Sequence, residues 1–455
     1  MDQALDILRR ATENTPYEGR LYLVGGIVRD RVMGRALDED IDIVLEGDAA
    51  ALAWMLRENG VALHDPVTFE RFGTAMVTVA GRQVEIAGAR KESYDRDSRK
   101  PSTQPGTLAE DAARRDFTVN ALLENLHTGE ILDLTGRALQ DIDARIIRTP
   151  LDPAVTFDDD PLRMLRAIRF AVRLRFDIHP ETCQATCDTA QRLSIVSAER
   201  VRDEFEKILM TPDATRGMEL LRETGLLSQF APELVAMHGV TQNVYHIHDV
   251  WTHTMRMLES LPPGAGIILR LAALMHDVGK VDTRSVDEDG SVHFYQHQSV
   301  GAAIARNIMH RLKFPNSSVE QVAFLISMHL RVGEYDEQWT DTAVRRLIRD
   351  AGPHLQDLIT LTRADKAASN PEMPSADLDA LQAHIGRVRE RLEGGGIRSP
   401  LDGREIMDLL GVRQGPVIGE VKAFLESRII EGELLPGDKA AAAELVRRRF
   451  GPCAD

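Results

Sequence analysis

Two carboxylates near the N-terminus are spaced for metal-dependent chemistry on phosphates. Asp40 and Asp42 flank Ile41 at the start of an apolar run that ends at Leu45. On a strand, residues i and i+2 point to the same face, so the two carboxylates are expected side by side. Such a pair is unfavourable without a cation, and Mg²⁺ prefers oxygen ligands. The motif predicts magnesium-dependent phosphoryl or nucleotidyl transfer, although a solvated surface pair would show the same pattern.

A glycine-rich turn precedes this pair. The sequence GGIVRD spans Gly25–Asp30 and follows the apolar run Leu21–Val24, which is expected to form a strand. Glycine lets the backbone approach a phosphate closely, and the N–H groups of the turn can point at that anion. Gly25 and Gly26 are therefore candidate nucleotide-binding residues. A glycine turn and a carboxylate pair, each at the end of a strand, together favour a nucleotide ligand over a plain turn.

A third motif, RRDFTVNA, spans Arg114–Ala121. Arginine supplies positive charge and a planar fork suited to a triphosphate. Asp116 can accept a hydrogen bond from a sugar hydroxyl, and Asn120 can orient the neighbouring backbone. A salt-bridged surface turn is the alternative interpretation of this motif taken alone.

The motif DDPLRMLRAIRF, Asp159–Phe170, has the start signals of a helix. Asp160 is a good N-cap, and Pro161 suits the first helical position. Asp160 and Arg163 can present an acceptor and donors to the flat edge of a base. An exposed basic face is the alternative. The helix has an arginine at every third position, namely Arg163, Arg166 and Arg169.

A separate group of residues predicts a metal site in the C-terminal half. His276 and Asp277 are adjacent at the end of an apolar helix, within LAALMHDVGK. Imidazoles and carboxylates together suit a divalent transition metal, which can activate water for phosphoester hydrolysis. A lone histidine here would be an ordinary core residue, but the number of candidates favours the metal. The set is His253, His276, Asp277 and Asp365, with His297 and His329 as further ligands or phosphate contacts.

Composition excludes several classes of protein. The chain has 455 residues and a net charge of −16, which argues against a uniformly basic nucleic-acid coat but permits a local basic groove. Three cysteines fit a reducing cytoplasm, and no apolar run approaches membrane-spanning length. The first sixteen residues have the pattern of an amphipathic helix rather than a signal peptide. We therefore expect a cytoplasmic protein that binds no membrane.

The elements that position these motifs change in type along the chain. Residues 1–150 mix strand and helix signals, and almost wholly helical patterns follow from about Pro161 to Lys366. Ser93–Gly106 is polar and contains proline, which favours a mobile loop, and Ser369–Asp377 is expected to be a linker. We predict an α/β head (1–150), a helical neck (151–240), a helical body (241–370), and a linker with a helical tail (371–455).

Residues 20–210 resemble the class II tRNA nucleotidyltransferase and poly(A) polymerase family of the DNA polymerase β-like superfamily. The resemblance rests on GGIVRD, DID, RRDFTVNA, DDPLRMLRAIRF and the helix ERVRDEFEKIL, in the family's order. It implies a polymerase β-like mixed sheet in the head. It also implies that Asp40 and Asp42 hold catalytic Mg²⁺. The remaining implied nucleotide contacts are Gly26, Arg29 and Arg115 at the triphosphate, Asp116 near the ribose, Asp160 and Arg163 at the base, and Arg166 and Arg169 at further positions.

One departure from the family's motifs and two alternative functions accompany this resemblance. The family's base-selecting motif is EDxxR, and its leading glutamate is Asp159 here. Ser93–Gly106 corresponds to the family's flexible loop, and its length favours completion of the A step. The implied activity is addition or repair of the CCA 3′ end of tRNA from CTP and ATP, with no obligate protein partner. A poly(A) polymerase and an A-only adding enzyme remain open.

Residues 246–366 look like an HD-superfamily phosphohydrolase domain. This resemblance implies an unidentified divalent metal at the histidine and aspartate set, and a possible second activity on phosphate esters. An HD phosphohydrolase with an RNA-binding head is the alternative from a different class, and the intact Asp40 and Asp42 pair argues against it.

Overall fold

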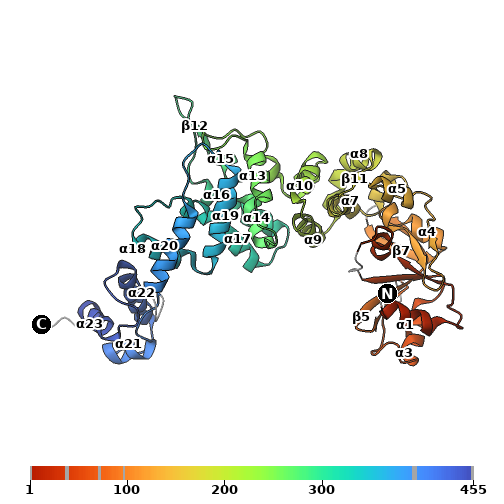
Figure 1. Cartoon of the computed structure of the whole chain (residues 1–455), viewed down its shortest axis with the longest axis horizontal. Helices are drawn as coiled ribbons and strands as arrows, with labels where there is room; N and C mark the ends of the chain where they lie inside the picture. Colours follow the sequence, from red (N-terminus) through yellow and green to blue (C-terminus); the bar gives the residue numbers. More distant parts are fainter. Residues whose placement is uncertain (1–2, 36–39, 70–72, 96–97, 392–396, 452–455) are drawn as a thin grey trace. The chain divides into compact units, whose positions relative to one another are not determined.

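The computed structural model describes residues 3–35, 40–69, 73–95, 98–391 and 397–451. The chain divides into two compact units. The first comprises Met1–Val235 with His310–Phe314, and the second comprises Ala236–Met309 with Pro315–Asp455. The first unit begins with a mixed α/β head, and nearly all later elements are helices (Figure 1). The predicted α/β head followed by helical regions is confirmed.

A seven-stranded mixed sheet forms the head, in the order β3-β4-β5-β2-β1-β8-β9. The central strands β2 and β5 are parallel, and their neighbours pair antiparallel. Both apolar runs predicted as strands are confirmed as β1 and β2. The strands are β1 (Leu21–Val24), β2 (Ile41–Leu45), β3 (Val67–Phe69), β4 (Thr74–Val79), β5 (Arg82–Gly88), β8 (Leu123–Asn125) and β9 (Ile131–Leu132).

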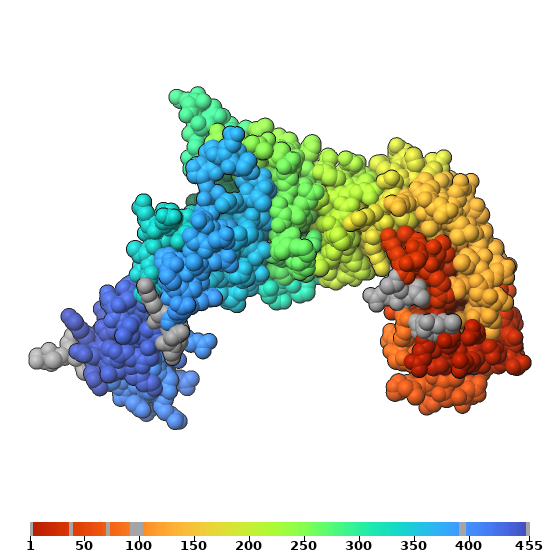
Figure 2. Space-filling model, in the orientation of Figure 1, coloured from red at the N-terminus to blue at the C-terminus, as the bar shows by residue number. Residues whose placement is uncertain are grey.

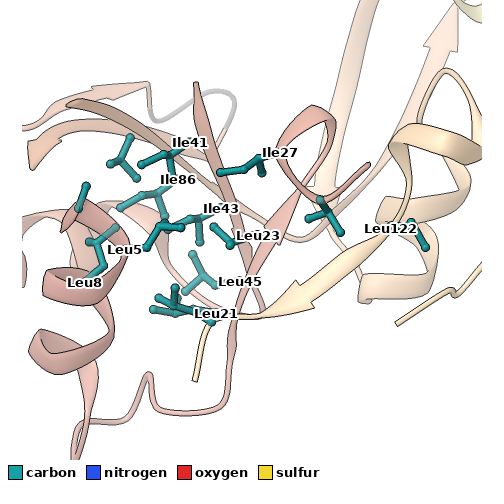
Figure 3. Close-up of a cluster of buried hydrophobic side chains, with 14 of the residues drawn as sticks. Leu5, Leu8, Leu21, Leu23, Ile27, Ile41, Ile43, Leu45, Ile86 and Leu122 are labelled. Atoms are coloured by element: carbon teal, nitrogen blue, oxygen red, sulfur yellow. The ribbon is translucent and has the colours of Figure 1, made fainter. Parts of the chain in front are cut away.

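One face of this sheet is buried in the core of the head. Ile41, Ile43 and Ile86 are fully buried there and pack with Leu5 and Leu8 of the first helix (Figure 3). Each such side chain contributes roughly 1.5–3 kcal/mol on burial. Side chains alternate along a strand, so the core residues on either side of position 42 direct that side chain to the opposite face. We call that opposite face the outer face.

The other elements of the first unit are mostly short helices. They are α1 (Gln3–Thr12), α2 (Gly26–Val32), α3 (Ala49–Glu58), α4 (Leu108–Ala113), η2 (Thr118–Asn120), α5 (Ala138–Ala144), α6 (Pro153–Asp159), α7 (Leu162–Leu174), α8 (Pro180–Thr189), η3 (Ala190–Ile195), α9 (Ala198–Leu209), α10 (Ala214–Glu223), α11 (Leu227–Phe230) and α12 (Pro232–Val235), with a two-stranded sheet of β10 (Ile146–Ile147) and β11 (Asp177–Ile178).

The second unit is helical apart from one hairpin. Its elements are α13 (Val250–Glu259), α14 (Ile267–Met275), α15 (Lys280–Thr283), β12 (Arg284–Val286), β13 (Val292–Phe294), α16 (His297–Arg311, whose end belongs to the first unit), α17 (Asn316–Gly333), α18 (Asp341–Ala351), η4 (Gly352–His354), α19 (Leu355–Ala368), α20 (Leu378–Arg391), α21 (Gly403–Leu410), α22 (Pro416–Glu431) and α23 (Lys439–Phe450). The β12–β13 hairpin projects from the surface of its unit (Figure 2).

The segment predicted as a loop at Ser93–Gly106 contains strands instead. β6 (Arg90–Asp95) and β7 (Ser98–Pro105) pair antiparallel, and residues 96–97 lie outside the described residues. Each strand of a two-stranded sheet is an edge strand, which tolerates a proline such as Pro105. The loop prediction was therefore wrong for these strands, because cross-strand pairing overrides weak local propensity. No helix in the described part of the chain is long and apolar enough to span a bilayer.

Candidate active site

The outer face of the head sheet carries the predicted carboxylate pair. Asp40 is exposed immediately before β2, and Asp42 is half-buried within it. Gly25 directly follows β1 and has a φ of 81°, a left-handed conformation that favours glycine. A Cβ atom built on Gly25 would lie 3.6 Å from Asp42 Oδ2, so the turn lies beside the carboxylate. The structure thus brings the first two sequence motifs together.

A third carboxylate was missed by the sequence analysis. Glu85 of β5 is paired in register with Asp42 of β2, and paired residues share a face of the sheet. In the sequence, Glu85 is marked as an acidic residue between apolar Val84 and Ile86, which the structure buries. Oxygen donors of this kind fit a hard divalent ion such as Mg²⁺.

Four of the candidate nucleotide-binding residues form a continuous hydrogen-bonded chain. Arg29 Nη1 donates to Asn120 Oδ1 at 2.7 Å, and Asn120 Nδ2 donates to Asp116 Oδ1 at 3.1 Å. Asp116 Oδ2 accepts from Arg166 Nε at 2.9 Å and from its Nη2 at 2.5 Å. We call these four residues the buried chain. It connects α2, beside Asp42, with α7.

Charge and an aromatic ring hold the buried chain in place. Burial opposes ionisation of Asp116, but the charge and hydrogen bonds of Arg166, with that of Asn120, outweigh it and lower the pKa of Asp116 to about 2. The guanidinium groups of Arg29 and Arg166 lie 5.6 and 5.4 Å from the centre of the Phe170 ring. Cations are attracted to the face of such a ring. Arg29 is only 1% exposed, and its Nη1 contacts Asn120 rather than the surface.

The predicted base-reading residues lie at the start of α7. α7 begins at Leu162, and Asp160 Oδ1 accepts a hydrogen bond from the Leu162 N–H at 3.2 Å. The other oxygen of Asp160 is 3.3 Å from Arg200 Nη2. Arg163 Nη2 donates to the carbonyl of Arg114 at 2.8 Å, which ties α7 to the RRDFTVNA motif. The helix start was predicted correctly to within two residues.

Two further candidates are held by carboxylates outside the buried chain. Arg115 Nη2 is 2.9 Å from Asp111 Oδ2, and Arg169 Nε is 3.1 Å from Glu204 Oε2. Both acids are buried, so each pairing neutralises an interior charge. Arg169 also lies 4.6 Å from the centre of the Phe170 ring that Arg29 and Arg166 face. The contact of Arg115 and Arg169 with a nucleotide stays a prediction.

A second cluster of predicted residues lies in the second unit. His276 and Asp277 follow α14, and the Nε2 atom of His276 is 3.0 Å from Asp277 Oδ2. The Nε2 atoms of His253 and His297 lie 3.7 and 3.5 Å from oxygens of the same carboxylate. His329 joins the cluster through His297, with the two Nε2 atoms 3.4 Å apart. These side chains come from several helices and converge on one buried aspartate.

Backbone carbonyls orient all four imidazoles. A carbonyl oxygen only accepts, so the Nδ1 atom beside it carries the proton, and Nε2 of the neutral ring has a free lone pair. This orientation is typical of metal-binding histidines. The Nδ1 atoms of His253, His276, His297 and His329 lie 3.4, 2.8, 2.9 and 2.6 Å from the carbonyl oxygens of Ala368, Ala273, Phe294 and Ile326.

Buried atoms of this cluster fit a bound cation. Nε2 of His253 and of His276, Oδ2 of Asp277 and Oδ1 of Asp365 have no well-aligned hydrogen bond among the described residues, although His253 Nε2 and Asp365 Oδ1 are 3.0 Å apart. Two sets of three could each hold an ion: His253, His276 and Asp277, and Asp277, His297 and His329. Burial lowers the pKa of His329 to about 4, which leaves a neutral imidazole able to bind metal.

Two residues at this cluster were not predicted from the sequence. Lys280 Nζ is 2.7 Å from Asp277 Oδ2, and His246 packs its ring 4.5 Å from that of His253. Burial and the Lys280 charge lower the pKa of His246 to about 3, so its imidazole is neutral. Lys280 lies three residues after Asp277, a spacing that places both on one side of a helical turn and could have identified it.

The predicted linker forms one wall of a cavity beside this cluster. The cavity has a volume of about 850 Å³ and is lined by Tyr245, His246, Asp365 and residues 369–379. Asn370 anchors the segment, because its N–H donates to the Tyr245 carbonyl at 2.9 Å. Most of Ser369–Asp377 is irregular, as predicted, but it packs against the helical body instead of connecting two parts freely.

Comparison with known families matches three regions of the chain. A poly A polymerase head domain matches residues 21–148, and a probable RNA and SrmB-binding site of polymerase A matches residues 175–237. An HD domain matches residues 243–370, the region of the histidine and aspartate cluster.

Similar proteins match over nearly the whole chain. The A-adding tRNA nucleotidyltransferase of Deinococcus radiodurans is 35% identical over 96% of this chain and 97% of its own length. The CC-adding tRNA nucleotidyltransferase of Thermus thermophilus is 33% identical over 92% of each chain. The structure of the Bacillus stearothermophilus CCA-adding enzyme in complex with CTP has a TM-score of 0.68 and 24% identity, with 98% of both chains covered. The Thermotoga maritima CCA-adding enzyme complexed with tRNA has a TM-score of 0.60 and 20% identity, covering 98% of this chain and 96% of its own.

Proposed function

Because this chain belongs to the tRNA nucleotidyltransferase family and carries an HD domain, we propose that it builds or repairs the CCA 3′ end of tRNA from CTP and ATP. The buried chain is the observation that carries this proposal. It links the glycine turn and Asp42 to the helix that begins beside Asp160 and Arg163. Hydrogen bonds thereby connect the residues proposed for phosphate chemistry with those proposed for base recognition.

In the proposed reaction, the 3′-hydroxyl of the RNA attacks the α-phosphorus of the nucleotide in line, and pyrophosphate leaves. Magnesium held by Asp40 and Asp42 would make the hydroxyl more acidic and neutralise charge on the leaving group. The protein's own part is positioning. Asp116, which is proposed to lie near the ribose, fixes Arg166, while Arg29 positions Asn120 from the interior.

Base selection is proposed to depend on Asp160 and Arg163, without a nucleic-acid template. Asp160→Ala should lower the preference for CTP and ATP over UTP and GTP by roughly 5- to 150-fold, the value of a lost base-edge contact. Single-addition assays with each nucleotide measure this preference. Asp158→Ala is the matched control, because Asp158 is 45% exposed and pairs with Arg192. An Asp160→Ala enzyme with wild-type preference would contradict the assignment.

The range of nucleotides added has a direct test. tRNA transcripts that end before CCA, or after CC, are incubated with CTP alone, ATP alone or both, and the 3′ ends are sequenced. We expect CC from CTP alone and complete CCA from both. The β6–β7 hairpin, which occupies the position of the family's flexible loop, supports completion of the A step. Addition of A only, as the name of the Deinococcus radiodurans relative describes for that protein, or untemplated A runs on other RNA, would replace this proposal.

A second activity is proposed for the HD domain. Its support is the convergence of four imidazole Nε2 atoms and two carboxylates with unsatisfied buried atoms. A divalent transition metal held there would supply a Lewis acid for the hydrolysis of 2′,3′-cyclic or terminal phosphates. The Lys280 ammonium group, beside Asp277, can pair with the negative charge of a phosphate. The adjoining cavity has room for a substrate.

A further inference from the structure

The outer face of the head sheet continues past the carboxylate pair onto strands that the proposed chemistry does not yet use. Strand register pairs Asp42 with Glu85 and Glu85 with Met76. It then pairs Met76 with Val67 on the edge strand β3. Paired residues share a face, so the four side chains form a row from the reaction site to the sheet edge. With neighbouring strands about 4.8 Å apart, the row is about 14 Å long.

This part of the face is hollowed and apolar. Phe69 lies on it, because Phe69 pairs with Thr74 and Thr74 pairs with Ala87, two residues beyond Glu85. Phe69 is 45% exposed and Val67 is 54% exposed, and large apolar side chains grouped this way commonly mark a binding surface. A cavity of about 310 Å³ lies here, lined by Phe69, Thr74, Ala75, Met76, Glu85 and Arg90.

On the other side of Asp42, the same face is covered. Val24, Val44 and Leu123 are buried there in one cluster with Leu108 of α4. Among the described residues, the exposed apolar side chains of this face lie on the β3–β4–β5 side. We call this surface the edge hollow.

The geometry of in-line displacement indicates which ligand binds the edge hollow. The attacking oxygen and the departing pyrophosphate lie on opposite sides of the α-phosphorus. The Gly25 turn, which is proposed to hold the triphosphate, directly follows β1 and lies beside Asp42. In the strand order, β1 and β5 lie on opposite sides of β2, and the edge hollow lies on the β5 side. We therefore expect the attacking RNA end on the side of the edge hollow.

Resting on the proposed nucleotidyl transfer, we propose that the edge hollow binds the 3′-terminal nucleoside of the RNA being extended. Phe69 stacks on its base, and Met76 forms the apolar floor beside it. Stacking accepts any base, which suits a primer whose last residue changes with every addition. Glu85 can accept a hydrogen bond from a ribose hydroxyl, and Arg90, which lines the same hollow, can pair with a phosphate of the RNA backbone.

The test compares Phe69→Ala with two matched variants. Phe69→Tyr keeps the stacking ring. Trp54→Ala removes an aromatic side chain of similar exposure, 44%, from α3, which packs on the core face. The KM for the RNA and the KM for the nucleotide are measured separately. Equilibrium binding of an RNA that ends in a 3′-deoxynucleoside is measured without added metal, so that one readout is independent of turnover.

We expect Phe69→Ala to raise the RNA KM and weaken RNA binding roughly 5- to 150-fold, with the nucleotide KM unchanged. Phe69→Tyr and Trp54→Ala should behave as wild type. Wild-type RNA binding by Phe69→Ala, or an equal effect on both KM values, overturns the inference. Absence of nucleotide addition by the wild-type protein would instead overturn the proposed function.

Discussion

Asp42→Ala is expected to reduce nucleotide addition by about a thousandfold or more, which corresponds to several kcal/mol of lost transition-state stabilisation. The side chain lies on the outer face, half-buried, while its neighbours Ile41 and Ile43 supply the core. The substitution removes a charge beside Glu85 and leaves no cavity in the core, so thermal stability should change by no more than about 0.5 kcal/mol. The rate of single-nucleotide addition and the melting temperature are the two measurements.

The control for this result is Asp65→Ala. Asp65 is an exposed acid of the head that pairs with Arg57 outside the site, and its loss should change neither measurement. Addition by Asp42→Ala within tenfold of wild type would remove the carboxylate pair from the mechanism. A large fall in melting temperature would mean that the loss of activity reports unfolding, in which case Asp42→Asn decides.

Asp277→Asn is expected to weaken binding of a divalent transition metal to the HD domain by at least about a hundredfold. Asp277 is the carboxylate shared by both candidate sets of ligands, so one substitution removes the negative charge from each. Calorimetric titration with Mn²⁺ or Ni²⁺ measures the affinity, and hydrolysis of a 2′,3′-cyclic phosphate measures the activity. Both are made in an Asp42→Ala background, which prevents the head from contributing to the signal.

The matched control is Asp287→Asn. Asp287 also contacts a histidine, with Oδ2 3.0 Å from His293 Nε2, but it lies on the exposed β12–β13 hairpin. The Asp277 variant also leaves Lys280 buried without its carboxylate, which typically costs about 3–5 kcal/mol, so circular dichroism must show that it folds. Asp365→Asn, at a carboxylate that is 26% exposed, gives a second variant. The wild-type protein could show neither metal binding nor hydrolysis, or all variants could show both equally. Either outcome would mean that the HD domain has only a structural role.

Local chemistry determined which elements the sequence could predict. The glycine turn and the two apolar runs were correct because burial and backbone freedom act over a few residues. The start of α7 was correct to within two residues, because Asp160 accepts a hydrogen bond from the Leu162 N–H and Pro161 has no N–H to leave unpaired. The grouping of His253 with Asp277 and Asp365 was predicted from the residue types, since imidazoles and carboxylates are metal ligands, but their distances depend on the packing of distant helices.

Register and long-range pairing account for what was missed. Glu85 joins the carboxylates only because β2 and β5 are parallel in one register, which depends on the whole sheet. The pairing of β6 with β7 stabilises polar residues that have little strand propensity of their own. His246 lies in an irregular segment, and only the packed body places its ring against His253.

The buried chain has a consequence for efforts to reprogram this enzyme. Arg29, Asn120, Asp116 and Arg166 belong to three separate segments of sequence, yet each depends on the next for its charge or hydrogen bond. A library that randomises all of α7 would therefore be dominated by variants with an unpaired Asp116. Libraries restricted to Asp160 and Arg163, with the four residues fixed, should contain a much higher fraction of folded members. The positions that can vary in directed evolution are Asp160, just before α7, and Arg163 in its first turn.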